Sequence, residues 1–300
     1  MELLACLDKE YMTTATPRIS ASQPAATRAR LYLEATILVT LMAALYADTL
    51  VDMAKDWWNV PAWSQGMLLP PLAAYITWMR RHRTLACVAT TDGRGFVLAA
   101  LASFTFLMGR LASEFFLTRI SFVIMLAALG WIFWGIPRLK TLLLPLLLLA
   151  TMVPLPGVIY NSLAAPLQLF ASSVATTLAQ AAGVSIYREG NIIDLAGISL
   201  GVAEACSGLN SLSAMLVGSL LIGFFSCERT LSRAALLAIS VPLAIAINVV
   251  RVTATAILAD YNREFAMGFY HLFSGWLVFV AGIGLLYGFA SLLHRLESSR

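Results

Sequence analysis

The sequence predicts an all-α protein that crosses a membrane several times. Of its 300 residues, 60% are hydrophobic and only 12% are charged, and the mean hydropathy is +0.81. These values lie far outside the range of soluble globular domains. Apolar runs recur at lengths near the ~20 residues that a helix needs to cross a bilayer core. We expect about eight transmembrane helices, near 31–50, 66–80, 95–111, 119–136, 141–158, 206–226, 232–259 and 267–293.

The basic residues predict the orientation of these helices, because short cytoplasmic loops are enriched in Lys and Arg. With both termini in the cytoplasm, 14 of the 20 basic residues fall in inner segments and five in outer segments, and Arg251 lies within a span. We expect a cytoplasmic tail over 1–30, a single transmembrane domain over 31–293 and a cytoplasmic tail over 294–300. The net charge of +4 then requires only the lipid bilayer as a partner, and no nucleic acid.

The longest outer segment, 159–205, is expected to contain two kinds of structure. Its first part, 162–182, has apolar residues at helical spacing, which fits either a helix in the membrane interface or a partly buried ninth helix. Its second part has strand-like positions around the turn residues Gly190 and Asn191, which predicts a short periplasmic β-hairpin or meander. Sheet edges are not stable in hydrocarbon. This segment is therefore a candidate platform for an extended substrate peptide.

The predicted topology separates the reactive side chains. Only Cys206 among four cysteines and His271 among three histidines lie on the outer side. A disulfide from Cys206 to another cysteine would therefore have to cross the bilayer, and no Cys/His pair has the spacing of zinc ligands. Arg251 lies roughly 13 Å below the outer end of its helix, and charges at such depth usually face a cavity or a partner. Asn248 lies three residues earlier, on the same face.

These residues are suited to acyl transfer at a peptide bond. A thiol at a helix N-terminus and near a cation has a lowered pKa, so Cys206 is the expected nucleophile. His271 is the expected acid and base, and Arg251 the group that holds the oxyanion or a substrate carboxylate. Support from Asn248 is also expected. No cofactor and no metal are expected.

The roles of Glu204 and Ser207 beside the thiol, and the function of the protein, each allow more than one interpretation. Glu204 could orient Arg251 or His271, or only favour the dipole of its own helix. Ser207 could either form a hydrogen bond within the site or cap the helix. A membrane transporter that binds an anion at Arg251 is the main alternative function. A non-catalytic factor for polysaccharide export or assembly is the third.

Several motifs give the chain a resemblance to the exosortase/archaeosortase family of membrane proteins. Glu204-Ala205-Cys206-Ser207-Gly208-Leu209 is similar to the family's cysteine signature, Asn248-Val249-Val250-Arg251 to its N-x-x-R motif, and His271 with Gly275 to its H-x-x-x-G motif. The resemblance continues through Tyr187-Arg188-Glu189-Gly190-Asn191, Pro154-Leu155-Pro156, Leu167-Gln168 and, more weakly, Asp56-Trp57-Trp58 with Ser64-Gln65-Gly66. At the last site the family is expected to have His, so Gln65 departs from the pattern.

The resemblance implies a cysteine transpeptidase of the bacterial inner membrane whose active site faces the periplasm. Its substrates would be proteins that end in a PEP-CTERM type sorting signal, which is a short Pro-Glu-Pro-like motif, an apolar helix and a basic tail. Such enzymes are associated with exopolysaccharide production. Arg188 and Asn191 lie in a matching segment and are expected to bind substrate. Either water or an amine could be the final acceptor.

Overall fold

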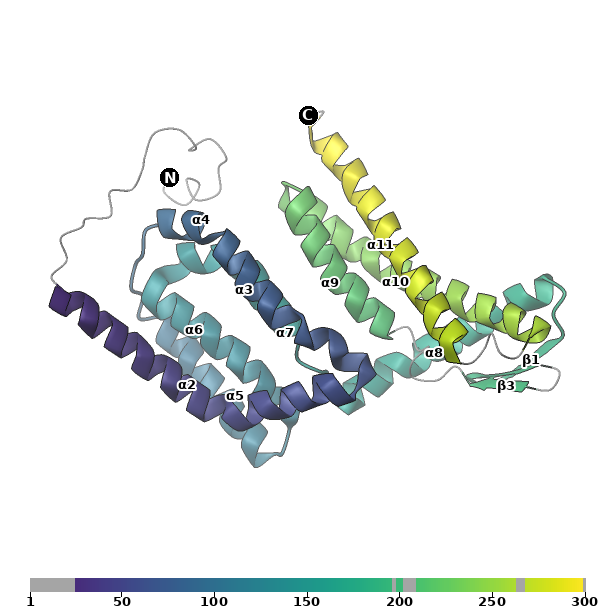
Figure 1. Ribbon diagram of the computed structural model, residues 1–300, viewed down its shortest axis with the longest axis horizontal. Coiled ribbons are helices and arrows are strands. Elements are labelled where there is room, and N and C mark those ends of the chain that lie inside the picture. The colour runs from purple at the N-terminus through teal and green to yellow at the C-terminus, as the bar shows by residue number, and fades with distance from the viewer. Residues whose placement is uncertain (1–24, 196–197, 202–208, 263–267, 299–300) are drawn as a thin grey trace. The chain divides into compact units, whose positions relative to one another are not determined.

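The computed structural model describes residues 25–195, 198–201, 209–262 and 268–298 (Figure 1). Its contacts divide the chain into two compact units, residues 1–154 and 155–300. Both are built mainly from helices, and the second also contains a small sheet. The predicted residues Cys206, Glu204 and Ser207 lie outside the described residues.

The first unit consists of six α-helices and one 3-10 helix among its described residues. They are α2 (Ala25–Asn59), η1 (Pro61–Met67), α3 (Leu69–Met79), α4 (Arg81–Ala86), α5 (Gly95–Leu111), α6 (Phe115–Thr141) and α7 (Leu143–Thr151). Pro70 and Pro71 lie in the first turn of α3, where the missing N–H costs little. Helix α6 is interrupted at Gly135, whose φ of 76° requires glycine, two residues before Pro137.

Tyr46 lies at the centre of the packing among α2, α5 and α6. Its fully buried ring makes edge-to-face contacts with Phe106 and Phe122, with centroids 5.0 and 5.2 Å apart. Its hydroxyl shares a hydrogen bond of 3.1 Å with the Ser121 hydroxyl. A hydroxyl that is buried in an apolar core requires such a partner. The contact therefore fixes α2 against α6 in one register.

One turn of α2 holds two further anchors of the first unit. Asp56 forms an ion pair with the nearly fully buried Arg119 of α6. Trp57, the next residue, donates a hydrogen bond of 3.1 Å from Nε1 to the Met152 carbonyl. A Cβ on Gly66 would overlap the indole ring of Trp57, so glycine is needed there. The weakest part of the family resemblance therefore coincides with a packing site that joins α2, η1 and α6.

The second unit contains four helices and a three-stranded sheet. They are α8 (Gly157–Ala181), β1 (Ile186–Glu189), β2 (Ile192–Leu195), β3 (Ile198–Gly201), α9 (Leu209–Ser226), α10 (Thr230–Tyr261) and α11 (Gly268–Ser298). The sheet order is β1-β2-β3 and both pairs are antiparallel. Where the sequence predicted a hairpin or meander, the structure has a meander. The first turn is the two residues Gly190 and Asn191, and Gly190 has a φ of 62°, which favours glycine.

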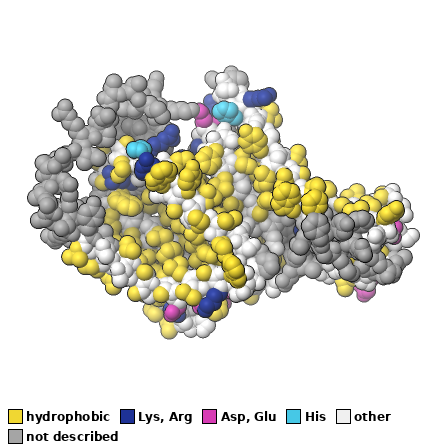
Figure 2. Space-filling view, viewed as in Figure 1, with side chains coloured by type: hydrophobic (Ala, Val, Ile, Leu, Met, Phe, Trp, Pro, Cys, Tyr) yellow, Lys and Arg dark blue, Asp and Glu magenta, His cyan; other side chains and the backbone are white. Residues whose placement is uncertain are grey.

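The described residues include six helices that are long and apolar enough to cross a membrane. They are Thr36–Asn59, Phe115–Thr141, Gly157–Ala181, Leu209–Ser226, Thr230–Tyr261 and Gly275–Ser298, and Gly95–Leu111 is a shorter apolar helix. Large hydrophobic side chains are exposed along these helices, as the yellow surfaces in Figure 2 show. Such exposure is typical of a surface solvated by lipid. The protein is a polytopic, mostly helical membrane protein.

The helix boundaries differ from the predicted spans in two places. The expected span 141–158 is not one helix, because α7 ends at Thr151 and α8 begins at Gly157, after Pro154 and Pro156. Proline cannot donate the helical hydrogen bond, so the chain turns there. The expected span 66–80 is divided between η1 and the 11-residue α3. Residues 162–182, predicted as an interfacial or a ninth helix, are helical through Ala181 as part of the 25-residue α8.

Replacing Asp56 with Asn should destabilise the first unit, because it leaves the guanidinium of Arg119 buried without its counter-ion. Asp56 is about one-third exposed, so we expect a loss of about 2 kcal/mol in the free energy of unfolding, less than for a fully buried pair. Urea unfolding in mixed micelles would measure it. Asp48→Asn is the matched control, since the Asp48–Arg110 pair is exposed; an equal loss in both variants would contradict the assigned role of Asp56.

Candidate functional site

Hydrogen bonds hold the C-terminal end of α11 against the turn that joins α9 to α10. The carboxylate of Glu297 accepts hydrogen bonds from the backbone N–H groups of Glu228 and Arg229, at 3.0 and 3.1 Å. The C-terminal end of α11 thus lies beside the turn between α9 and α10. Since these helices run in alternating directions, the N-termini of α9 and α11 and the C-terminal end of α10 lie at the opposite end (Figure 1).

Small residues allow these three helices to approach closely. Gly282 of α11 faces Ile247 of α10 and the sulfur of Met215 in α9, and a Cβ on Gly218 would lie 2.8 Å from Ile283. Transmembrane helices commonly associate through such positions, because missing side chains bring the backbones together. The same three helices share a buried cluster that contains Met215, Leu236 and Leu286. The bundle therefore holds the polar residues of α10 and α11 at fixed positions.

Arg251 points from α10 onto the backbone of α11 at Gly275. A Cβ placed on Gly275 would lie 3.0 Å from Cζ of Arg251 and 3.1 Å from both Nε and Nη2. The glycine thus provides the space that the guanidinium occupies. Gly275 is four residues after His271 in the same helix, so the two positions share one helical face. The structure brings Arg251 to the face of α11 that carries His271.

Asn248 lies one turn before Arg251 on α10 and is 3% exposed. The i, i+3 spacing gives both residues the same side of the helix. The side chain of His271 lies outside the described residues, although its backbone is part of α11. Leu209, the first residue of α9, follows Cys206 by three positions and is buried. Of the predicted catalytic group, the structure therefore describes the Arg251 side chain and the helix positions around it.

The sheet rests on the same part of α10. Ile186, Ile193 and Leu195 form a buried cluster with alanines of α8 and with Val252 and Ala256 of α10. Val252 is the residue after Arg251, so the inner face of the sheet packs on the turn of α10 that contains the arginine. This contact gives the strand segment a fixed place in the second unit. The hydrophobic alternation of β2, with Ile193 and Leu195 buried and Ile192 exposed, is what creates the contact.

The two predicted substrate-binding residues of this segment help to hold the first turn of the sheet. Arg188 donates from Nη1 to the Gly190 carbonyl at 2.7 Å, and Asn191 donates from Nδ2 to Oε1 of Gln168 in α8 at 3.2 Å. Ser172 of α8 also donates to the Gly190 carbonyl. These contacts explain why the turn residues and Leu167-Gln168 occur as linked motifs. Substrate binding by Arg188 and Asn191 stays a prediction.

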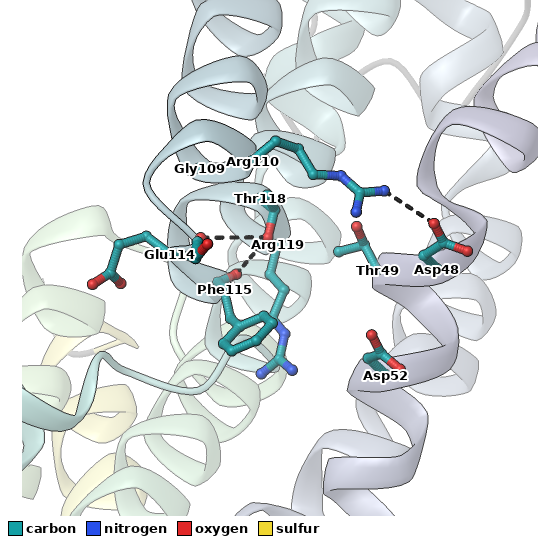
Figure 3. A pocket seen from close by; sticks show the side chains of 10 residues that line it. Asp48, Thr49, Asp52, Gly109, Arg110, Glu114, Phe115, Thr118 and Arg119 are labelled. Atoms are coloured by element: carbon teal, nitrogen blue, oxygen red, sulfur yellow. Dashed lines mark hydrogen bonds and ion pairs between the residues drawn. The ribbon is translucent and has the colours of Figure 1, made fainter.

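The first unit has its own pocket, shown in Figure 3, lined by Asp48, Thr49, Asp52, Gly109, Arg110, Ser113, Glu114, Phe115, Thr118 and Arg119. Arg110 bonds to Asp48 across it, and Thr118 bonds to backbone carbonyls of its own helix. Among these described residues there is neither a thiol nor an imidazole. The Asp48–Arg110 ion pair joins α2 to α5 at this pocket, and Arg119, which lines it, pairs with Asp56 of α2. Sequence reasoning missed these pairs, although the three carboxylates at 48, 52 and 56 share one face of an apolar helix.

The two cysteines among the described residues, Cys87 and Cys227, are not reactive thiols. Cys227 is free and buried. Burial and the nearby Glu297 carboxylate raise the pKa of its thiol, although Arg233 opposes them, so it stays protonated and is a poor nucleophile. Cys87 is disulfide-bonded. No group of three or more His, Cys, Asp or Glu side chains in the described segments is arranged to hold a metal ion.

The fold and the site define a helical, multi-pass membrane protein with an arginine held against a glycine inside a three-helix bundle. Comparison with protein families gives a match to the model described as transmembrane exosortase, over residues 57–288. This range covers well over half of the chain and includes positions 206, 251 and 271. The chain belongs to the transmembrane exosortase family. No curated protein and no solved structure matches it significantly.

The anchoring of the sheet to α8 gives a prediction about local stability. Gln180 donates from Nε2 to the Ile186 carbonyl at 3.0 Å, and Gln180→Leu would leave that carbonyl without this donor. A lost hydrogen bond of about 1 kcal/mol should accelerate hydrogen exchange of the β1 amides about 5-fold, measured by mass spectrometry. Thr177→Val, which affects only a hydroxyl bonded within α8, should leave exchange unchanged. Equal rates in both variants would show that Gln180 does not anchor the strand.

Proposed function

We propose that this protein is a cysteine transpeptidase that cleaves and sorts proteins anchored by a C-terminal PEP-CTERM type signal. It acts at the periplasmic face of the bacterial inner membrane, with both of its termini in the cytoplasm, and serves exopolysaccharide production. The observation that carries the proposal is the contact of the Arg251 guanidinium with Gly275, on the helical face of His271 and in a bundle whose α9 begins three residues after Cys206. Membership of the exosortase family supports it.

The reaction follows from the chemistry of these groups. The Cys206 thiolate attacks the carbonyl carbon of the scissile peptide bond, and the negative charge moves to the carbonyl oxygen. The bond to nitrogen then breaks, His271 gives a proton to the leaving amine, and a thioester remains on Cys206. Water or an amine attacks the thioester and releases the thiolate, with His271 as the base. Arg251 stabilises the oxyanion or binds a carboxylate of the sorting motif.

The position of the site suits a substrate that is itself anchored in the membrane. Arg251 lies ten residues before the last residue of α10, roughly 15 Å along the helix. A guanidinium packed against protein at the membrane boundary attracts a developing negative charge more strongly than one that is fully solvated by water. The substrate diffuses laterally, and its sorting motif emerges beside the ends of α9 and α11. Asn248, Glu204 and Ser207 support the reacting groups.

The thiol can be tested with a periplasmic reporter that ends in a Pro-Glu-Pro motif, an apolar helix and a basic tail. Cys206→Ala should reduce cleavage of this reporter in cells below detection on an immunoblot, because no other group replaces the thiolate. Cys227→Ala should cleave normally, since that thiol is buried and protonated. Cleavage that persists in Cys206→Ala, at equal protein levels in the membrane, would exclude the thiol mechanism and favour a transporter or an export factor.

The contact of Arg251 with Gly275 can be tested without changing the arginine. Gly275→Ala places a Cβ 3.0–3.1 Å from the guanidinium, which must then move by a few tenths of an ångström. We expect reporter cleavage to fall about 10-fold, because small displacements of a catalytic group are costly. Gly284→Ala in the same helix has open space around the new Cβ and should cleave normally. Cleavage is compared at equal protein levels in the membrane, and wild-type cleavage by Gly275→Ala would refute the assigned geometry.

A further inference from the structure

The two outer edges of the sheet differ in what covers them. A two-residue turn makes Glu189 and Ile192 a hydrogen-bonded pair, and bonded and non-bonded pairs alternate from there. The backbone groups of Ile186 and Arg188 therefore point away from β2. The Ile186 carbonyl accepts its hydrogen bond from Gln180 of α8, which agrees with this alternation. Helix α8 thus covers the β1 edge.

The same alternation determines which backbone N–H and C=O groups of β3 point away from β2. Residues 192 and 194 of β2 bond to β1, so Ile193 and Leu195 bond to β3, where their partners are Leu200 and Ile198. The N–H and C=O groups of Ser199 and Gly201 consequently point away from the sheet. No described strand pairs with this side of β3. The β3 edge offers two donors and two acceptors in the spacing of a strand.

The composition of β3 favours pairing at this edge. Natural sheets protect free edges with charged residues, proline or bulges, and β3 (Ile198-Ser199-Leu200-Gly201) has neither charge nor proline. Leu200 packs inward on the cluster that contains Val252, whereas Ser199 is exposed. The sheet is thus held against the turn of α10 that contains Arg251. Gly201 precedes position 206 by five residues, which span at most about 18 Å.

We propose that the outer edge of β3 binds the substrate chain next to its scissile bond, as a fourth strand of the sheet. This inference rests on the proposed function and specifies how the substrate is held. Main-chain hydrogen bonds to Ser199 and Gly201 orient an extended segment while reading little of its sequence. A Pro-Glu-Pro motif is compatible with this position. Its two prolines face away from β3, as they must at an edge, and the N–H between them faces β3.

Ser199→Pro tests the edge because it removes one outward N–H and leaves the bonds between β2 and β3 in place. We expect reporter cleavage to fall at least ~10-fold, with Ser199→Ala, which retains the N–H, close to wild type. Alkylation of Cys206 by iodoacetamide should be unchanged in both. Normal cleavage by Ser199→Pro, while Cys206→Ala is inactive, would overturn the edge proposal and leave the thiol mechanism standing. Cleavage by Cys206→Ala would instead refute the proposed function.

Disulfide crosslinking gives a second measurement that does not depend on activity. Ser199→Cys is combined with Cys206→Ala, and single cysteines are placed at successive positions of the reporter before its apolar helix. Strand pairing predicts crosslinks through residue 199 that alternate with a period of two residues, identified by mass spectrometry. Crosslinks without alternation would overturn the proposal. Homodimers of the Ser199→Cys protein without the reporter would assign the edge to a second copy of the chain and would also overturn it.

Discussion

The packing of the Arg251 guanidinium on Gly275 is the contact on which the second unit depends. A positive charge inside a membrane helix costs several kcal/mol unless protein or water surrounds it, and the missing side chain at position 275 makes room for it. Gly218 and Gly282 let α9, α10 and α11 approach closely. This approach places α10 and α11 close enough for Arg251 to reach Gly275. The Glu297 contacts then fix which ends of the helices meet. A charge, three glycines and one carboxylate thus determine the geometry of the bundle.

The small sheet is held in the second unit by the packing of one of its faces and by the hydrogen bonds of one of its edges. One face of the sheet is covered because Ile186, Ile193 and Leu195 pack on α8 and α10. One edge is covered because Gln180 and Ser172 bond to backbone carbonyls of the hairpin. The motifs at 187–191 and 167–168 therefore contact each other, through the hydrogen bond between Asn191 and Gln168. Their structural role is to hold the strands beside the arginine.

The first unit uses charge pairs and aromatic packing in place of a reactive group. Asp56 neutralises the buried Arg119, and Trp57 fills the space above Gly66 while bonding to the Met152 carbonyl. Gln65, where the family is expected to have His, lies in η1 directly before that glycine. The backbone around position 65 is thus determined by the packing of Trp57. The spacing of Trp57 and Gly66 thus has a structural explanation that does not involve an imidazole.

The sequence by itself determined the class of protein, the helices with strong apolar runs and the residues that carry the family motifs, because hydropathy and residue type are local properties. It placed Arg251, Asn248 and the strand segment correctly within their elements. It failed at 141–158, where Pro154 and Pro156 divide an apolar run that hydropathy alone reads as continuous, and at 66–80, which is divided between η1 and α3. Only the tertiary structure decided that Arg251 meets Gly275, that Arg119 pairs with Asp56 and that one edge of the sheet is covered. These contacts join residues 24 to 63 positions apart or depend on the direction of backbone groups, and no local pattern in a sequence encodes either.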